Sequence, residues 1–327
     1  ARWPLAMLGV RVGAAALRLW AFGGVSFAHN SDDGRYAVVA RNLSNGHLPE
    51  GDAEWFGYRI TFLWPVALLF RTLGASDYTA VAWPLVGSLA AVLVAGLIGR
   101  EIGGPWVGLI AAALVAAAPM EVIMGTRLRP DALMPAFVGL AVWSALRAGR
   151  SSRRGIWWAA AAGAALGAGW FVRESIFVMA PVVIFAGRRA GPRGLAAGVA
   201  GVGAVATLVA GLAIVSGASV GRPFLAAPTE TIWRNPLAVY SWDDSYLARA
   251  LRGALDPGHP LFLLLPAVGV AAQIMLVTGN RRRPLAGAGG ARAVAWLAWS
   301  VIYLELGVRV NLDKPLRFLT LASFPLA

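Results

Sequence analysis

Two neighbouring carboxylates, Asp32 and Asp33, directly follow the first long apolar segment of the chain. Adjacent carboxylates at a membrane surface are what a general base or a metal-binding site would use. They also suit a structural role, because Ser31 or Asp32 can cap the segment that follows, and acidic side chains complement the dipole of a helix at its start. Both interpretations of this acid pair stay open at this point.

The segment after these acids has the spacing of an amphipathic helix. Tyr36, Ala40 and Leu43 fall on one helical face, and Arg35 and Asn42 fall on the other. A helix of this kind lies along a surface and does not cross the membrane. We therefore expect a surface helix with the acid pair at its start.

Other charged residues stand at the ends of apolar segments. Asp131 precedes a predicted helix over 132–147 and can either cap that helix or belong to a site. Arg173 and Glu174 end the apolar run 155–172, and charged side chains at membrane depth are functional candidates by default. An ion pair that satisfies itself is the alternative for Arg173.

The composition identifies the environment of these charges. Of the 327 residues, 58% are apolar and 14% are charged, whereas about a quarter of an ordinary soluble domain is charged. The long uncharged runs approach or exceed the roughly 18 residues that cross a bilayer as a helix, and they cover 81–99, 103–120, 155–172, 194–221 and 260–280. This excludes an ordinary water-soluble domain and predicts an all-α polytopic membrane protein.

The organisation follows from these runs. We expect about nine to ten transmembrane helices in a single domain over 1–327, with two large outer loops at 29–73 and 218–258. The predicted helices cover 3–28, 58–73, 78–99, 103–121, 131–147, 155–172, 175–187, 194–217, 260–279 and 292–308, and another begins near 316. Because that last segment stops after a few turns, we expect the chain to belong to a longer protein.

The charge is strongly basic, with 29 Lys and Arg against 16 Asp and Glu and a net charge of +13. Most of the excess lies in short loops near 100, 147–154, 188–193 and 281–292, where Glu101 is the only acidic neighbour. Such arginines mark the cytoplasmic side of a membrane protein, so the acidic loops face outward. The arginines lack the interleaved aromatic side chains of a nucleic-acid site, and we expect no nucleic-acid partner.

Other sequence features are weaker indicators of a site. The chain has no cysteine, which excludes a thiolate nucleophile and Cys-ligated zinc. His47 and His259 show no ligand spacing, and we predict no metal ligands. The segment from Trp242 to Tyr246 either binds sugar or forms a solvated turn.

Four segments together resemble the GT-C glycosyltransferases. Asp-Asp-Gly-Arg-Tyr-Ala-Val-Val-Ala-Arg-Asn-Leu at 32–43 resembles their Asp-Glu-Ala-Arg-Tyr-Ala-x-x-Ala-Arg signature. Segments 58–74, 97–104 and 119–131 look like their juxtamembrane helix, their Gly-Arg-x-Leu-Gly cytoplasmic turn and their second outer loop. The superfamily includes protein O-mannosyltransferases, of glycosyltransferase family 39, and the aminoarabinose transferase of lipid A. Thr-Phe-Leu at 61–63 replaces the usual Pro-Pro-Leu, which bears on the acceptor class more than on the fold.

The resemblance implies a GT-C-type helix bundle with juxtamembrane helices in the first outer loop, and it implies roles for the acids. Asp32 matches the carboxylate that acts as general base on the acceptor hydroxyl or organises a metal near it. Asp33 is its neighbour, standing where Glu is usual, and Asp131 matches a second acid that faces the same cavity.

The resemblance also implies a set of cations. A phosphate leaving group needs cations on the outer side of the membrane. The predicted phosphate- and donor-binding residues are Arg129, Arg173, Lys314 and Arg317. As alternatives, Arg127 and Arg129 neutralise Asp131, and Arg317 extends from the membrane to its interface.

The implied reaction is transfer of a hexosyl or pentosyl group from a polyprenyl-phosphate sugar to a glycan, lipid or protein acceptor. The expected location is the bacterial inner membrane, among membrane lipids, with the site facing outward. No cofactor is required by these residues, and a divalent metal is left open. The alternative is a non-catalytic GT-C-like subunit, a scaffold of a larger membrane complex. A secondary transporter would show inverted repeats, and the sequence has none.

Overall fold

The computed structural model describes residues 2–23, 32–47, 59–150, 154–173, 176 and 179–215. Nearly all of them belong to one of two compact units, the one formed by Ala1–Ala117 and Glu121–Glu230. The loop and helices predicted beyond 217 lie outside the described residues. The expected helix count and the single domain therefore stay predictions.

The described part of the chain is helical and contains no strand. Its α-helices are α1 (Arg2–Ala21), α2 (Asp32–Ser44), α4 (Ile60–Leu73), α5 (Asp77–Gly103), α6 (Pro105–Ala117), α7 (Pro119–Gly125), α8 (Met134–Ala148), α9 (Gly155–Trp170), α10 (Ala180–Gly187) and α11 (Gly191–Val215). Short 3-10 turns, η2 (Pro130–Ala132) and η4 (Arg188–Ala190), precede α8 and α11. Four segments are long and apolar enough to cross a membrane: Trp3–Ala21, Asp77–Gly103, Pro130–Ala148 and Ala180–Leu212. The prediction of an all-α polytopic membrane protein is confirmed.

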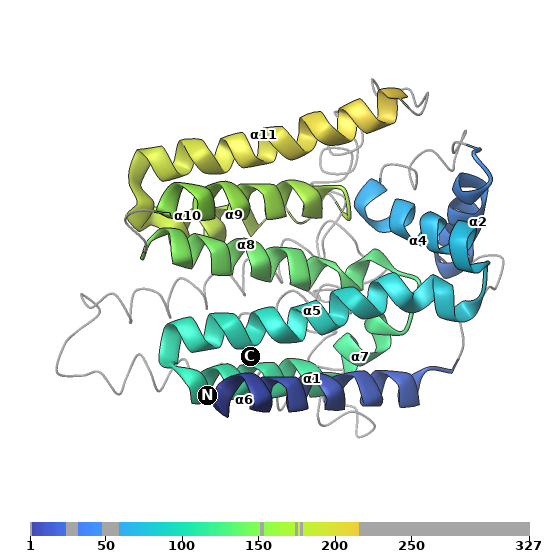
Figure 1. The fold of residues 1–327 in the computed structure, drawn as a ribbon, viewed down its shortest axis with the longest axis horizontal. Coiled ribbons are helices and arrows are strands. Elements are labelled where there is room, and N and C mark those ends of the chain that lie inside the picture. Colours follow the sequence, from blue (N-terminus) through green and yellow to red (C-terminus); the bar gives the residue numbers. More distant parts are fainter. Residues whose placement is uncertain are drawn as a thin grey trace, which may run out of the picture. The chain divides into compact units, whose positions relative to one another are not determined.

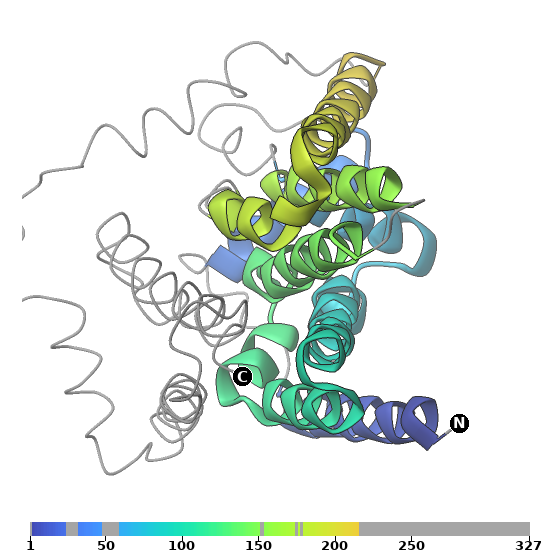
Figure 2. The same cartoon turned by 90° about the vertical axis from the view of Figure 1, so that its left-hand side faces the viewer.

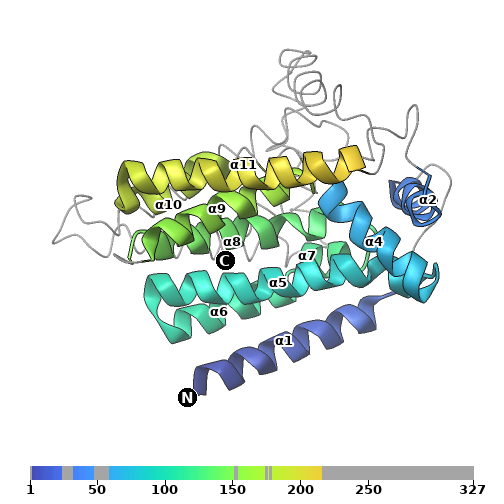
Figure 3. The same cartoon turned by 45° about the horizontal axis from the view of Figure 1, so that its top comes forward.

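The helices form a series of neighbours. α1 contacts α6, α6 contacts α5, α5 contacts α8, α8 contacts α9, and α9 contacts α11. Figure 3 shows this order from α1 to α11, and Figure 2 shows the same helices closer to end on. The closest approach joins α9 to α11, where a Cβ added at Gly163 would lie 1.8 Å from the carbonyl oxygen of Gly198. Only glycine lets two backbones come this close.

The two ends of this bundle differ in what they carry (Figure 1). The connections α5–α6, α8–α9 and α10–α11 share one end, at the left of the view, whereas α2, α4 and α7 lie at the other. The arginine-rich turns near 100, 147–154 and 188–193 therefore share an end, opposite the helix that begins with Asp32 and Asp33.

One predicted helix, over 103–121, is wrong as a continuous element. It divides into α6, which ends at Ala117, and α7, which begins at Pro119. Proline has no backbone N–H and its ring clashes with the preceding turn, so an α-helix breaks there. Gly104, with φ of 91°, makes the sharp turn between α5 and α6 that only glycine adopts readily.

Other helix boundaries also differ from the prediction by a few residues, and three of them bear on the region around the acids. The first helix ends at Ala21 instead of 28, and α10 begins at Ala180 instead of 175. The helix predicted from 131 starts with η2, and α8 begins at Met134. The last difference matters most, because it decides what Asp131 does.

Candidate active site

The acid pair stands at the start of α2, which packs against α4. The rings of Tyr36 and Phe62 meet edge to face with their centroids 5.1 Å apart, and the Arg59 guanidinium carbon lies 5.3 Å from the Tyr36 ring centroid. These contacts hold α2 against α4 and so determine where Asp32 and Asp33 lie.

The amphipathic pattern predicted for this helix is confirmed. Tyr36 and Ala40 are buried and Leu43 is half-buried, whereas Arg35 and Asn42 are exposed. The apolar face of α2 packs on α4, and its charged face points away from the protein. Burial of the apolar side chains is what stabilises a short helix of this kind.

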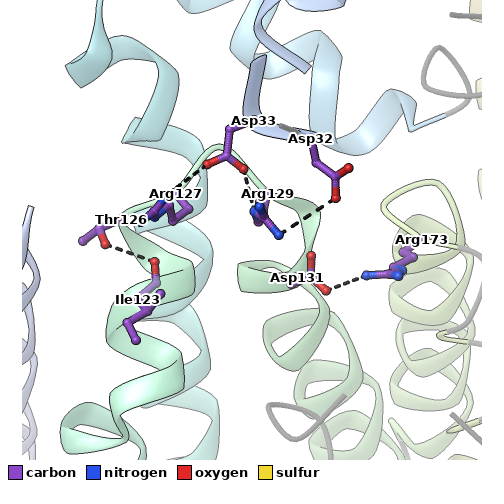
Figure 4. A network of polar contacts seen from close by, with 8 residues as sticks. All are labelled: Asp32, Asp33, Ile123, Thr126, Arg127, Arg129, Asp131 and Arg173. Atoms are coloured by element: carbon purple, nitrogen blue, oxygen red, sulfur yellow. Dashed lines mark hydrogen bonds and ion pairs between the residues drawn. The ribbon is translucent and has the colours of Figure 1, made fainter. Parts of the chain in front are cut away.

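Arg129 joins the two acids to the loop between α7 and α8 (Figure 4). Its Nε donates a hydrogen bond of 2.5 Å to Oδ1 of Asp33, and its Nη1 lies 3.9 Å from Oδ2 of Asp32. Arg127 Nη1 lies 3.6 Å from the other oxygen of Asp33. The Asp33 side chain is 1% exposed and that of Asp32 is 17% exposed. Asp33 is therefore the buried partner of two arginines, and Asp32 is the more accessible acid.

The backbone conformation at Arg129 sets the direction in which its side chain leaves the loop. Arg129 precedes Pro130, and a residue before proline is restricted to extended conformations. Its φ and ψ are −137° and 143°, after which Pro130 starts η2 and its carbonyl accepts from Leu133 N–H at 3.0 Å. On the other side, Thr126 Oγ1 donates to the carbonyl of Ile123 at 3.0 Å and closes the end of α7. The loop is thus held at both ends by local hydrogen bonds.

Asp131 pairs with Arg173 at the end of α9. Arg173 Nη1 donates a hydrogen bond of 2.5 Å to Asp131 Oδ1, with side chains 7% and 2% exposed (Figure 4). The capping interpretation of Asp131 is wrong, because the N-cap of α8 is Leu133 and no side chain caps it. Asp131 Oδ2 is buried without a hydrogen-bond partner in the described part. Glu174, the other partner considered for Arg173, lies outside the described residues.

The fold brings five of the predicted site residues to one end of the bundle: Asp32, Asp33, Arg129, Asp131 and Arg173. Lys314 and Arg317 lie outside the described residues, as do Trp242, Tyr246 and His259. The roles of the five stay predictions. As a set, carboxylates of different burial lie beside guanidinium groups, which is an arrangement able to receive a proton and to bind an anionic phosphate.

No group of three or more His, Cys, Asp or Glu in the described residues has the arrangement of a metal site. Each acid of the cluster instead faces an arginine. Whether a divalent metal takes part stays open.

Besides Arg18, two buried charged residues had not been predicted as part of a site. Arg59 is 8% exposed and lies against the acid-bearing helix, and Glu121 is 2% exposed within α7. The signal in the sequence for Glu121 is a single acid directly after a long apolar run, close to Pro119.

Comparison with protein families gives a match over about half of the chain. Residues 60–218 match the family described as dolichyl-phosphate-mannose-protein mannosyltransferase. The matched region extends from α4 through α11 and includes the loop with Arg129 and Asp131 as well as Arg173. No curated protein and no solved structure matches the chain.

Proposed function

We propose that this chain, whose family match supports a membrane glycosyltransferase of the GT-C superfamily, transfers a sugar from a polyprenyl-phosphate donor to an acceptor hydroxyl at the end of the bundle that carries Asp32. The observation that carries the proposal is the convergence of α2, the α7–α8 loop and the end of α9 on one cluster of acids and arginines. The sugar is a hexose or a pentose, and the acceptor is a glycan, a lipid or a protein.

Asp32 and Asp33 have different roles in the proposed reaction. The acceptor oxygen attacks C1 of the sugar while its proton passes to a carboxylate, and the bond from C1 to the phosphate oxygen breaks with departure of polyprenyl phosphate. Asp32 is the general base, because it is the more exposed acid and its oxygen lies farther from Arg129. Asp33 is held by Arg127 and Arg129, which suits it to orient α2 and the loop.

The arginines supply positive charge for the leaving phosphate. A guanidinium has five N–H donors in a planar fork, so it can hold a carboxylate on one edge and a phosphate oxygen on another. Arg129 and Arg173 are each held by an acid in a defined direction. This preorganisation is what stabilisation of a developing charge requires. Lys314 and Arg317 are proposed as further phosphate ligands.

The charge pattern supports an outward-facing site. The arginine-rich turns lie at the end of the bundle opposite the acid cluster. The positive-inside rule assigns such turns to the cytoplasm, and this supports the proposal that the cluster lies on the extracytoplasmic face of the bacterial inner membrane. A donor anchored by its lipid tail presents its phosphate at this level.

A non-catalytic subunit is the second candidate. It is favoured by the pairing of Asp131 with Arg173 and of Asp33 with Arg129, since mutually satisfied buried pairs also serve as structural links. In that case the cluster would hold a scaffold of a larger membrane complex together.

An activity measurement separates the two candidates. The purified protein in lipid nanodiscs is given radiolabelled polyprenyl-phosphate mannose and a panel of glycan, lipid and peptide acceptors, and release of polyprenyl phosphate is followed. Asp32→Asn is expected to lower transfer by about 10²–10⁴-fold, the usual contribution of a general base. The control is Glu101→Gln, at the opposite end of the bundle. Full activity of the Asp32 variant would overturn the assignment, and absence of transfer with every sugar donor tried would favour the scaffold.

A further inference from the structure

A second polar cluster lies inside the bundle, around Arg18 of α1. This arginine is fully buried. Its Nε donates to Ser88 Oγ of α5 at 2.8 Å, and its Nη1 donates to the carbonyl oxygens of Ala14 at 3.1 Å and Ala116 at 3.0 Å. One side chain therefore joins α1, α5 and the last turn of α6.

The hydrogen bond to Ser88 continues into α7. Ser88 Oγ donates to the backbone carbonyl of Glu121 at 3.1 Å. At the other end of α7, Gly125 lies so close that a Cβ there would be 2.8 Å from Ser88 Oγ and 3.3 Å from Arg18 Nε. Both ends of this short helix are thus held against Ser88 and Arg18.

The Glu121 side chain adds an ionisable group to the same cluster. It is 2% exposed, and neither carboxylate oxygen has a hydrogen-bond partner in the described part of the chain. It interacts electrostatically with Arg18 and with Asp131. A buried charge is costly unless an opposite charge lies near. Burial raises the pKa of the Glu121 carboxyl to about 8, and the nearby Arg18 guanidinium opposes this rise without overcoming it.

The position of α7 needs such external contacts. Because Pro119 interrupts the helix after α6, the backbone does not continue from α6 into α7, and the direction of α7 is not set by a continuous hydrogen-bond ladder. The break also removes helical donors for nearby carbonyls, and Arg18 supplies one to Ala116. α7 then leads through three residues to Arg129 and on to Asp131.

From this connection we infer that Arg18 is a positioning residue: it fixes α7 and thereby aligns the loop with Arg129 and Asp131 against the acids of α2. When transferase activity is the quantity measured, the inference rests on the proposed function. It assigns Arg18 no contact with the substrate. Ser88 acts with it through its hydroxyl, which joins Arg18 to the backbone carbonyl of Glu121.

The chain offers a matched control on the same helix. Arg11 lies two turns before Arg18 on the same face of α1 and is half-buried, and its Nε has no hydrogen-bond partner in the described residues. Arg18→Met and Arg11→Met each remove one guanidinium from α1, but only the first removes the contacts to α5 and α6. Arg18→Lys keeps the charge and part of the hydrogen bonding. Ser88→Ala removes the hydroxyl that accepts from Arg18 and donates to the Glu121 carbonyl, and it leaves the other Arg18 contacts in place.

The first measurement is of kinetics per folded molecule. Arg18→Met is expected to lower kcat about tenfold or more, with a smaller change in KM for polyprenyl-phosphate mannose, because misalignment affects the reacting geometry more than binding. Arg18→Lys is expected to recover part of kcat, and Arg11→Met to behave as the parent. If Arg18→Met does not fold, Ser88→Ala carries the test and is expected to lower kcat several-fold. If the kcat per folded molecule of Arg18→Met equals that of the parent, the inference is overturned. If Arg18→Met does not fold, a parental kcat in Ser88→Ala overturns it.

The second measurement does not depend on activity. Because the chain has no cysteine, nitroxide labels can be placed uniquely at Asn45→Cys, after α2, and at Ile123→Cys on α7, both exposed positions. A narrow distance distribution is expected in the parent and in Arg11→Met, and a broadened or shifted one in Arg18→Met and Ser88→Ala. Unchanged distances in these two variants overturn the inference. Changed distances in a protein without transferase activity uphold the positioning and reject the proposed function.

Discussion

Two arginine–carboxylate clusters stand at opposite ends of the bundle. At one end, Glu101 pairs with Arg147 at 3.0 Å and also with Arg150, and these arginine side chains are 45% and 43% exposed. At the other end, Asp131 and Arg173 form a pair that is 2% and 7% exposed. Both clusters pair arginine with a carboxylate, but the first is exposed to solvent and the second is buried.

Burial makes these pairs unequal. An exposed ion pair is screened by water and contributes about 0–1 kcal/mol to stability. Removing one partner of a buried pair leaves an uncompensated charge and costs about 3–5 kcal/mol. A charge is therefore kept in a buried position chiefly where the protein uses it, and the comparison points to the Asp131 end as the working one.

The largest expected difference is in stability. Asp131→Asn strands the charge of Arg173 and is expected to lower the free energy of unfolding by about 3–5 kcal/mol, whereas Glu101→Gln lowers it by less than about 1 kcal/mol. Denaturant unfolding of the purified protein in detergent, followed by tryptophan fluorescence, measures both. Equal losses in the two variants would remove the distinction between the ends.

The next effect is on catalysis. Arg173→Gln removes a cation proposed to stabilise the leaving phosphate and is expected to lower kcat/KM by about 10²–10³-fold, the usual effect of deleting one preorganised donor. Arg147→Gln, the matched change at the opposite end, is expected to leave kcat/KM within about twofold, as is usual for a surface change away from the site. Initial rates with polyprenyl-phosphate mannose give the comparison. A small effect at Arg173 would show that its pair with Asp131 is structural.

A smaller effect sharpens the geometry of the acid cluster. Arg129→Lys keeps the positive charge but loses the planar fork that faces both Asp32 and Asp33. We expect kcat to fall about tenfold, a loss of roughly 1.4 kcal/mol of transition-state stabilisation, with the fold unchanged by circular dichroism. Parental kcat would mean that charge alone suffices at this position.

The smallest effect concerns salt. Arg150→Gln is expected to change the free energy of unfolding by less than about 1 kcal/mol at low ionic strength, and the change is expected to vanish near 0.5 M NaCl because exposed charges are screened. The loss in Asp131→Asn is expected to persist in the same salt. Melting curves at two salt concentrations test this. A salt-independent loss in Arg150→Gln would contradict the assignment of its pair with Glu101 as a surface contact.

Much of the local structure could be read from the order of residues. The apolar runs located the helices, and the spacing of Tyr36 and Ala40 located the buried face of α2, because these features depend on neighbours within a few positions. The break between α6 and α7 was missed although Pro119 is visible, since the apolar run continues across it. Boundaries were the weaker part of the prediction.

The pairing of charges could not be read in the same way. Asp131 has Arg127 and Arg129 within four residues, yet its partner is Arg173, 42 positions away. Arg129 turns instead to Asp33, 96 positions away. No rule based on neighbouring residues chooses among these cations.

By itself, the sequence determined the class of protein, the positions of the apolar helices, the clustering of arginines in short turns, and the residue types available for chemistry. These follow from hydrophobicity and short-range spacing, which each segment carries alone. Only the tertiary structure decided that Asp131 is an ion-pair partner instead of a helix cap, and that Arg18 links α1, α5 and α6. Buried charges are matched by whichever opposite groups the packing brings near, and that is a property of the assembled bundle.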